Sequence, residues 1–305
     1  MSNVLRPVLF GERSSTGRVG ADDGSAGIES ILGLAADVHL RELSVSGARV
    51  QVRMVGTGPI GIVLLHGWAC SSLYWLPVLK RLPVTEVTAV AVDLPGFGGS
   101  GVSRGPWSFE ACAEVVGEVV RSLDLPTRTL VVGHSMGGAV ALTLADRLPF
   151  EQVVLEGYCP MPPSLPERIE RLRLLREEGT CGPWIESMVR SWCVRTMGPN
   201  DVAILAGVAR NVSVEVLVRS MYCILEGVPL GVALRQCKGS AWVFGLADSH
   251  REMSAVEAMA EELGANLTVM GRSGHTPHVD EPDAFVDFVM RRALGRPDGI
   301  DGDGS

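Results

Sequence analysis

Residues 133–137 carry the pattern that is most typical of a catalytic nucleophile. They read Gly-His-Ser-Met-Gly, and they stand between an apolar run, TLVV, and a helical run, AVALTLADRL. In this strand-to-helix context the two glycines permit a tight, strained turn that exposes the hydroxyl of Ser135 at the N-terminus of the helix. The pattern predicts that Ser135 attacks an acyl carbon. The alternative is a glycine-rich turn in which the serine has no chemical role.

A serine hydroxyl needs a base to take its proton and a carboxylate to orient that base. Both groups follow Ser135 in the chain in the order acid, then base. Asp248 ends the stretch AWVFGLAD, which indicates a strand and a turn, and His275 follows an apolar run that ends at Met270. The backbone N–H of Met136, the residue after the nucleophile, is a candidate donor for the oxyanion of an acyl-transfer intermediate.

These groups need a rigid scaffold, and the sequence indicates an α/β fold. Short β-branched runs alternate with helical patterns, which is typical of a mostly parallel sheet with helices on both faces. We expect eight strands at Val38–Val45, Arg49–Met54, Ile62–Leu65, Val87–Val92, Thr129–Val132, Gln152–Leu155, Ala241–Phe244 and Asn266–Met270. The first two alternate in polarity and are joined by Ser-Gly, so they predict an antiparallel hairpin at one edge.

The alternation of strands and helices stops between Pro160 and Gln236, where several helical patterns follow a proline-rich entry. We interpret residues 160–236 as a helical cap inserted into an α/β core of residues 38–159 and 237–295. Residues 11–27 and 296–305 are rich in Gly, Ser and Asp and carry too little apolar surface to offset the entropy of ordering. We therefore predict flexible tails at residues 1–37 and 296–305.

Charge and cysteine content exclude several classes of protein. The chain has 27 Lys and Arg against 35 Asp and Glu, a net charge of −8, which argues against a nucleic-acid or membrane-surface partner. No apolar run is long enough for a signal peptide or a membrane span, so a cytoplasmic location is expected. Seven cysteines and six histidines show no metal-ligand spacing, so no metal and no cofactor is predicted. His134 and His278 are expected to be structural, and His39 and His250 have no supporting pattern.

Five ordered blocks of the chain resemble the α/β-hydrolase family. They are LLHGW at 64–68, DLPGFGGSG at 93–101, VVGHSMGG at 131–138, VFGLAD at 243–248 and GHTPHVDEPDAF at 274–285. The resemblance spans nearly the whole chain between the tails, and the HGW and DLPGFGGS blocks are most similar to pimeloyl-carrier-protein methyl esterases. It implies a serine hydrolase.

The resemblance also implies roles for single residues. Ser135 would be the nucleophile, Asp248 the acid, His275 the base, and the backbone N–H of Trp68 the second oxyanion donor. The segment Ser-His-Arg after Asp248 departs from the family, which has a small apolar segment with proline there. Glu156, at the end of the predicted strand in QVVLEG, is the competing acid, because some members of the family hold their carboxylate after this strand.

The expected substrate is a carboxylic ester or thioester of a medium-sized hydrophobic molecule, free or bound to a carrier, cleaved through an acyl-enzyme. A cap inserted after the strand that ends near Leu155 would lie over Ser135. Trp184, Met188 and Tyr222 would then contact substrate, although such residues fit the core of the cap equally well.

Three other functions remain open on the same scaffold. One is a non-hydrolytic lyase or cyclase of a small-molecule pathway that uses His275 as a base. The second is a hydrolase of carbon–carbon bonds, and the third is a ligand receptor with residual hydrolysis. Multiple turnover separates an enzyme from such a receptor.

Overall fold

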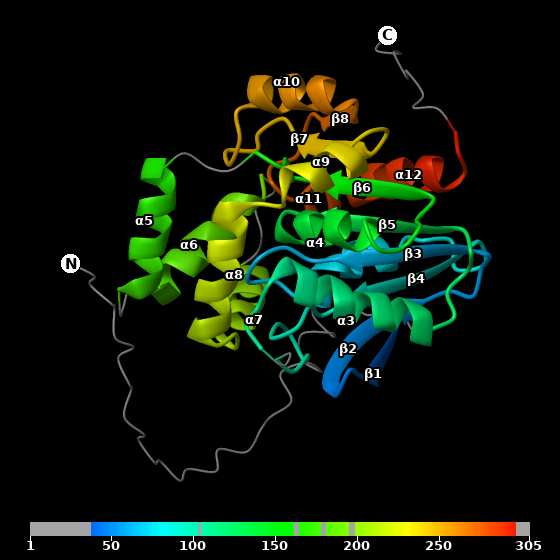
Figure 1. Cartoon of the computed structure of the whole chain (residues 1–305), viewed down its shortest axis with the longest axis horizontal. Coiled ribbons are helices and arrows are strands. Elements are labelled where there is room, and N and C mark those ends of the chain that lie inside the picture. Colours follow the sequence, from blue (N-terminus) through cyan, green and yellow to red (C-terminus); the bar gives the residue numbers. More distant parts are fainter. Residues whose placement is uncertain (1–37, 103–104, 162–164, 178–180, 195–198, 297–305) are drawn as a thin grey trace.

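The computed structural model describes residues 38–102, 105–161, 165–177, 181–194 and 199–296, and it contains one eight-stranded sheet with helices on both faces (Figure 1). The predicted tails, apart from Arg296, lie outside these residues. The strands are β1 (His39–Val45), β2 (Ala48–Val55), β3 (Ile60–Leu65), β4 (Val87–Val92), β5 (Thr129–His134), β6 (Gln152–Glu156), β7 (Ala241–Gly245) and β8 (Asn266–Met270). The predicted fold class and all eight predicted strands are confirmed.

The spatial order of the strands is β1-β2-β4-β3-β5-β6-β7-β8. β1 and β2 form the predicted antiparallel edge hairpin, and Ser46 and Gly47 at its turn both have positive φ, as a tight hairpin turn requires. β2 also runs antiparallel to β4, whereas all pairs from β4 to β8 are parallel. The carboxyl ends of β5, β6, β7 and β8 therefore lie side by side at one edge of the sheet, where the predicted site residues follow them.

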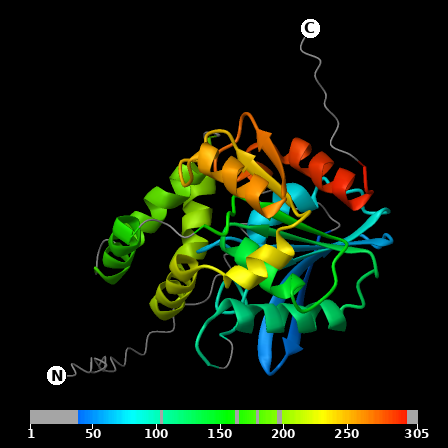
Figure 2. The same ribbon diagram turned by 45° about the horizontal axis from the view of Figure 1, so that its top comes forward.

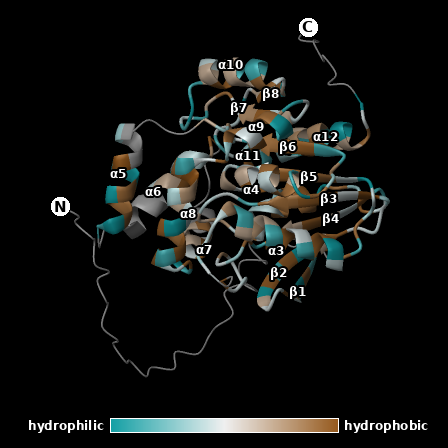
Figure 3. Cartoon of the chain, viewed as in Figure 1, coloured by the Kyte–Doolittle hydropathy of each residue, from teal (hydrophilic) through white to brown (hydrophobic). Residues whose placement is uncertain are grey.

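Helices cover both faces of the sheet because the central strands are apolar on both sides. In β3, Val63 and Leu65 belong to one buried apolar cluster, while Ile62 and Leu64 belong to the other. The first cluster includes residues of α3 (Phe109–Ser122), α4 (Met136–Ala145) and α10 (Met253–Leu263). The second includes residues of α2 (Leu76–Leu79) and α12 (Pro282–Ala293), near the short helices η1 (Ser72–Trp75) and α11 (Pro277–Asp280). Figure 3 shows the matching concentration of hydrophobic residues in the central strands.

Between β6 and β7, helices are the only regular secondary-structure elements among the described residues. These are α5 (Leu165–Arg176), α6 (Cys181–Trp192), α7 (Pro199–Arg210), α8 (Val214–Glu226) and α9 (Leu230–Gln236). α5 to α8 gather on one side of the sheet in both views (Figures 1 and 2), whereas α9 packs against α4. The division of the chain into a core and a cap at residues 160 and 236 stays a prediction.

No single helix in the described part of the chain is long and apolar enough to cross a membrane. One bent pair, α8 followed by α9 at 73°, passes the length and composition test only when the two helices are taken together.

Candidate active site

Ser135 lies in a strained turn between β5 and α4. Its φ is +49°, a value that residues with a side chain rarely adopt, and its backbone N–H donates to the carbonyl of Glu156 at 2.8 Å. A Cβ on Gly133 would lie 2.3 Å from the carbonyl oxygen of Gly137, and a Cβ on Gly137 would lie 2.3 Å from that of Leu65. The two glycines are therefore required by backbone contacts, which supports the interpretation of this segment as a nucleophile turn.

We expect Gly137→Ala to lower the free energy of unfolding by about 1–3 kcal/mol, because the new methyl group meets backbone that cannot rotate away. Gly207→Ala in α7 is the matched control. Its Cβ would have no neighbour within 4 Å, so this alanine should raise stability by about 0.5–1 kcal/mol through its better helix propensity. Urea unfolding measures both changes, and a Gly137→Ala protein as stable as wild type would contradict the steric argument.

A hydrogen bond connects Asp248 and His275. Nδ1 of His275 donates to Oδ2 of Asp248 at 2.9 Å, and both residues are 6% exposed. Burial opposes ionisation of Asp248, but the charge of His275 and hydrogen bonds from His250 and His275 outweigh it and hold the pKa of this carboxyl well below its usual value. When the ring of His275 is neutral, a carboxylate that accepts from Nδ1–H leaves Nε2 without a proton, as a general base requires.

Ser135 and His275 line the same pocket. Among the described residues, no hydrogen bond joins the hydroxyl of Ser135 to the imidazole of His275. Catalytic hydrogen bonds are often long before substrate binds and shorten in the complex, so this arrangement is compatible with proton transfer between the two.

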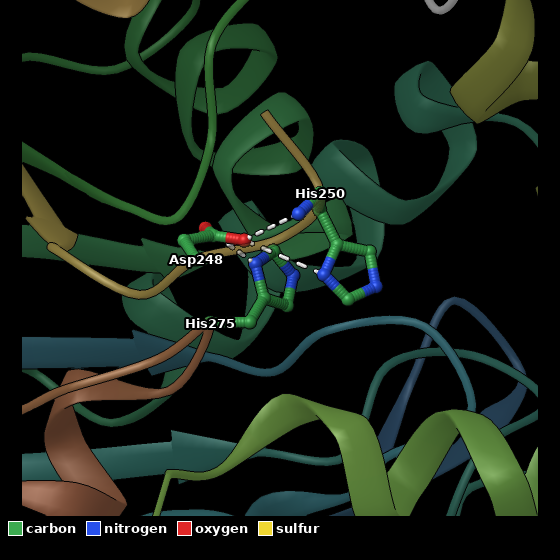
Figure 4. Close-up of side chains that lie close together, drawn as sticks. All are labelled: Asp248, His250 and His275. Atoms are coloured by element: carbon green, nitrogen blue, oxygen red, sulfur yellow. Dashed lines mark hydrogen bonds and ion pairs between the residues drawn. The ribbon is translucent and has the colours of Figure 1, made fainter. Parts of the chain in front are cut away.

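The sequence shows no pattern that supports a role for His250, yet this residue lies against the Asp248–His275 pair (Figure 4). Its backbone N–H donates to Oδ1 of Asp248 at 2.9 Å, and its Nδ1 lies 3.4 Å from the same oxygen. Its ring stacks on that of His275, with 4.3 Å between centroids. Burial lowers the pKa of His250, which favours the neutral ring beside His275. The only signal in the sequence is the departure from the family pattern after Asp248.

Asp248, His250 and His275 are also the one group of described residues whose potential metal-ligating atoms lie within 4.8 Å of one another. Two of those residues already share a hydrogen bond between a carboxylate oxygen and Nδ1–H. A cation bound to this Nδ1 would displace the proton that orients His275. The arrangement therefore suits an acid–base pair better than a metal centre.

Glu156, the competing acid, contacts a different histidine. Its Oε1 accepts from the backbone N–H and from Nδ1 of His278, both at 2.8 Å. Its side chain is fully buried, and burial raises the pKa of Glu156 to about 7. Nε2 of His134 donates to the backbone carbonyl of His275 at 3.1 Å. The three buried groups Glu156, His134 and His278 thus lie behind His275, without a direct hydrogen bond between Glu156 and the base.

Because of these buried groups, we expect the stability of the folded chain to decrease at acidic pH. Burial lowers the pKa of His134 and of His278 from 6.5 to about 3, so between these pH values the folded chain binds fewer protons than the unfolded chain. Stability must therefore fall as the pH falls through this range. Between pH 7 and 4.5, Glu156 makes the opposite contribution to stability, because its pKa is higher in the folded chain than in the unfolded chain. The loss of stability should therefore be steepest below pH 4.5.

Urea unfolding at pH 7, 5, 4 and 3.5 measures this loss of stability. His278→Asn should flatten the dependence below pH 4.5, whereas His39→Gln, at an exposed position, should leave it unchanged. A wild-type unfolding free energy that stays constant between pH 4.5 and 3.5 would contradict the assignment.

The two candidate oxyanion donors border Ser135 from different elements. Met136 begins α4, so its backbone N–H has no partner within the helix. The loop that carries Trp68 reaches the same place, since a Cβ on Gly67 would lie 3.4 Å from Cβ of Ser135. His66 fixes this loop: its Nδ1 donates to the carbonyl of Gly67 at 2.8 Å, and its Nε2 accepts from the N–H of Leu94 at 3.0 Å.

The pocket over Ser135 is lined by residues from the core and from the helices after β6. The described lining residues are Phe109, Ser135, Met136, Ala139, Gly157, Tyr158, Cys159, Pro160, Met161, Arg171, Ile224, Gly227, His250, Arg251 and His275. Met188 and Tyr222 are not among them. Met188 packs against the first apolar cluster, and the Tyr222 hydroxyl accepts from Arg176. The side chain of Trp184 lies outside those that the structure describes.

Comparisons with known proteins show which family and which structures the chain is similar to. A sequence model of the alpha/beta hydrolase family matches residues 62–288. The pimeloyl-[acyl-carrier protein] methyl ester esterase of Aeromonas salmonicida is 26% identical over 79% of this chain and 97% of its own length. An uncharacterized protein of Mycobacterium tuberculosis is 26% identical over 81% of this chain and 79% of its own length.

Solved structures share the fold at lower identity. An esterase from Exiguobacterium antarcticum superposes with a TM-score of 0.74 and 19% identity, over 82% of this chain and 97% of that protein. The enol-lactonase from Burkholderia xenovorans has a TM-score of 0.70 and 21% identity, over 83% of this chain and all of that protein.

Proposed function

Because the chain belongs to the alpha/beta hydrolase family, we propose that it is a serine esterase that works through a covalent acyl-enzyme. The observation that carries the proposal is the hydrogen bond that Asp248 accepts from His275, which lines the same pocket as Ser135. The names of relatives, such as pimeloyl-[acyl-carrier protein] methyl ester esterase, support an ester substrate that is free or bound to a carrier.

The proposed reaction has two halves. Nε2 of His275 takes the proton of Ser135 as Oγ attacks the ester carbonyl carbon, and the oxyanion accepts hydrogen bonds from the N–H groups of Trp68 and Met136. The C–O bond to the alcohol then breaks, and His275 returns the proton to the leaving oxygen. A water molecule, deprotonated by His275, attacks the acyl carbon and releases the acid and free Ser135. Thioesters follow the same path with a thiol as the leaving group.

Asp248 stabilises this cycle electrostatically. The imidazole of His275 carries a positive charge in both transition states, and the buried carboxylate beside it is already ionised. The stacked ring of His250 favours the same outcome while it is neutral, because a second cation at 4.3 Å would oppose the charge on His275.

Covalent labelling tests the proposal. A fluorophosphonate should modify Ser135, as mapped by mass spectrometry of the labelled peptide, and Ser135→Ala should not be labelled. Preincubation with a slowly hydrolysed ester should protect the serine. Labelling at another residue, or equal labelling of the alanine variant, would contradict the assignment. Hydrolysis of many ester molecules per chain would separate an enzyme from a receptor that stalls after acylation.

A further inference from the structure

Arg251 lies in the wall of the catalytic pocket, three residues after Asp248. It is half-buried, and its charge lies close enough to Tyr158 and Cys159 to interact with both. It lies in the same segment as His250, where the sequence departs from the family pattern. The proposed ester chemistry assigns no task to this guanidinium.

Arg251 has no hydrogen bond or ion pair to any group in the described part of the chain. Other described arginines do have carboxylate partners, such as Arg235 on Asp146 at 2.8 Å and Arg272 on Glu281 at 3.1 Å. A half-buried guanidinium loses part of its hydration, and this cost is normally offset by a paired carboxylate. The described protein groups therefore leave the hydrogen-bonding capacity of Arg251 incompletely satisfied.

The surroundings of Arg251 favour an anion. A second arginine, Arg171 of α5, lines the same pocket, and none of the described lining residues is Asp or Glu. The pocket thus brings two positive charges to the wall of the space that also holds Ser135.

Carboxylates and phosphates match this set of groups. A guanidinium presents parallel N–H donors that fit two oxygens of either anion, and such charge-assisted bonds are stronger than neutral ones. The rest of the pocket lining includes the apolar residues Phe109, Met161 and Ile224. The combination suits an apolar chain that ends in a negative charge.

We propose that the natural substrate is an ester or thioester that carries an anionic carboxylate or phosphate group, and that Arg251, assisted by Arg171, binds this group. The inference rests on the proposed esterase function and names its substrate class. A carboxylate would belong to a free dicarboxylic monoester, and a phosphate to a pantetheine-type arm.

Matched substrates test the inference. Mono-4-nitrophenyl adipate and 4-nitrophenyl hexanoate have acyl chains of equal length and differ by one carboxylate. Hexanoyl-4′-phosphopantetheine and hexanoyl-pantetheine differ by one phosphate. In wild type, kcat/KM should be higher for the anionic member of at least one pair. Arg251→Gln should reduce that preference about tenfold, mainly through KM, and Arg251→Lys should retain part of it.

Arg121→Gln removes the same charge from the exposed end of α3, outside the pocket lining, and should leave both ratios unchanged. A loss confined to the adipate pair identifies a carboxylate, and a loss confined to the phosphopantetheine pair identifies a phosphate. If Arg251→Gln changes neither ratio more than Arg121→Gln does, the inference is overturned. Each ratio is internal to one protein sample, so a partly unfolded variant cannot mimic the effect.

Binding separates this inference from the esterase proposal. Calorimetric titration of Ser135→Ala with monomethyl adipate and with pantetheine 4′-phosphate needs no turnover. Addition of Arg251→Gln to this variant should weaken at least one Kd about tenfold. If no ester is hydrolysed but this loss is seen, the esterase proposal fails and the anion site stands. If esters are hydrolysed and neither Kd changes, only the anion site fails.

Discussion

Ser135→Ala is expected to lower kcat/KM for an ester by a factor of about 10⁴ to 10⁶. The alanine removes the atom that forms the proposed acyl-enzyme, while the proposed oxyanion donors and the pocket remain, so a small residual rate should persist. Substrate affinity should change little. Steady-state kinetics with a 4-nitrophenyl ester measures the loss, and calorimetry of the variant measures affinity.

Ser122→Ala is the matched control for this substitution. Ser122 ends α3, and its hydroxyl donates to the carbonyl of Val119 at 2.9 Å, away from the described pocket lining. This variant should keep wild-type kcat. If Ser135→Ala kept more than about a tenth of wild-type turnover, an acyl-enzyme at this residue would be ruled out, and a lyase or cyclase that uses His275 as its base would become the leading alternative.

Asp248→Asn should lower kcat by about 10⁴, close to the loss of the nucleophile. The amide removes the negative charge beside His275, and it can present N–H donors where Nδ1 needs an acceptor. His275 then loses both its orientation and the stabilisation of its positive charge. Steady-state kinetics with the same 4-nitrophenyl ester measures the loss.

Glu156→Gln is the control that decides between the two candidate acids. Glu156 contacts His278 at 2.8 Å and has no hydrogen bond to His275, so its amide should reduce kcat by less than about tenfold. The substitution should act on the buried group behind His275, visible in the pH dependence of unfolding. A larger loss of kcat in Glu156→Gln than in Asp248→Asn would reverse the assignment.

The sequence predicted the scaffold well because its signals are local. Each parallel strand is a short apolar run, and a strand buried on both faces needs such a run whatever its neighbours are. The turn at Ser135 was also visible, since only glycine fits at 133 and 137, where a side chain's Cβ would lie 2.3 Å from the backbone of other residues. Patterns of this kind depend only on residues that are close together in the sequence.

Contacts between residues far apart in the chain could not be predicted from the sequence. Glu156 ends β6 and Asp248 follows the adjacent strand β7, so residue type and order could not choose between the two carboxylates. The choice depends on which carboxylate reaches Nδ1 of His275, and the structure places Asp248 there at 2.9 Å while Glu156 meets His278. Such distances depend on strand spacing and loop path.

By itself, the sequence determined the α/β architecture, the strained serine turn and the order of the candidate nucleophile, acid and base. Only the tertiary structure decided which groups surround them: His250 stacked on His275, Glu156 turned to His278, and unpaired Arg251 in the pocket wall of the described chain. The physical reason is the distance along the chain over which each kind of interaction acts. Apolar periodicity and turn geometry act within a few residues, whereas hydrogen bonds, stacking and unpaired charge depend on segments that folding brings together from across the chain.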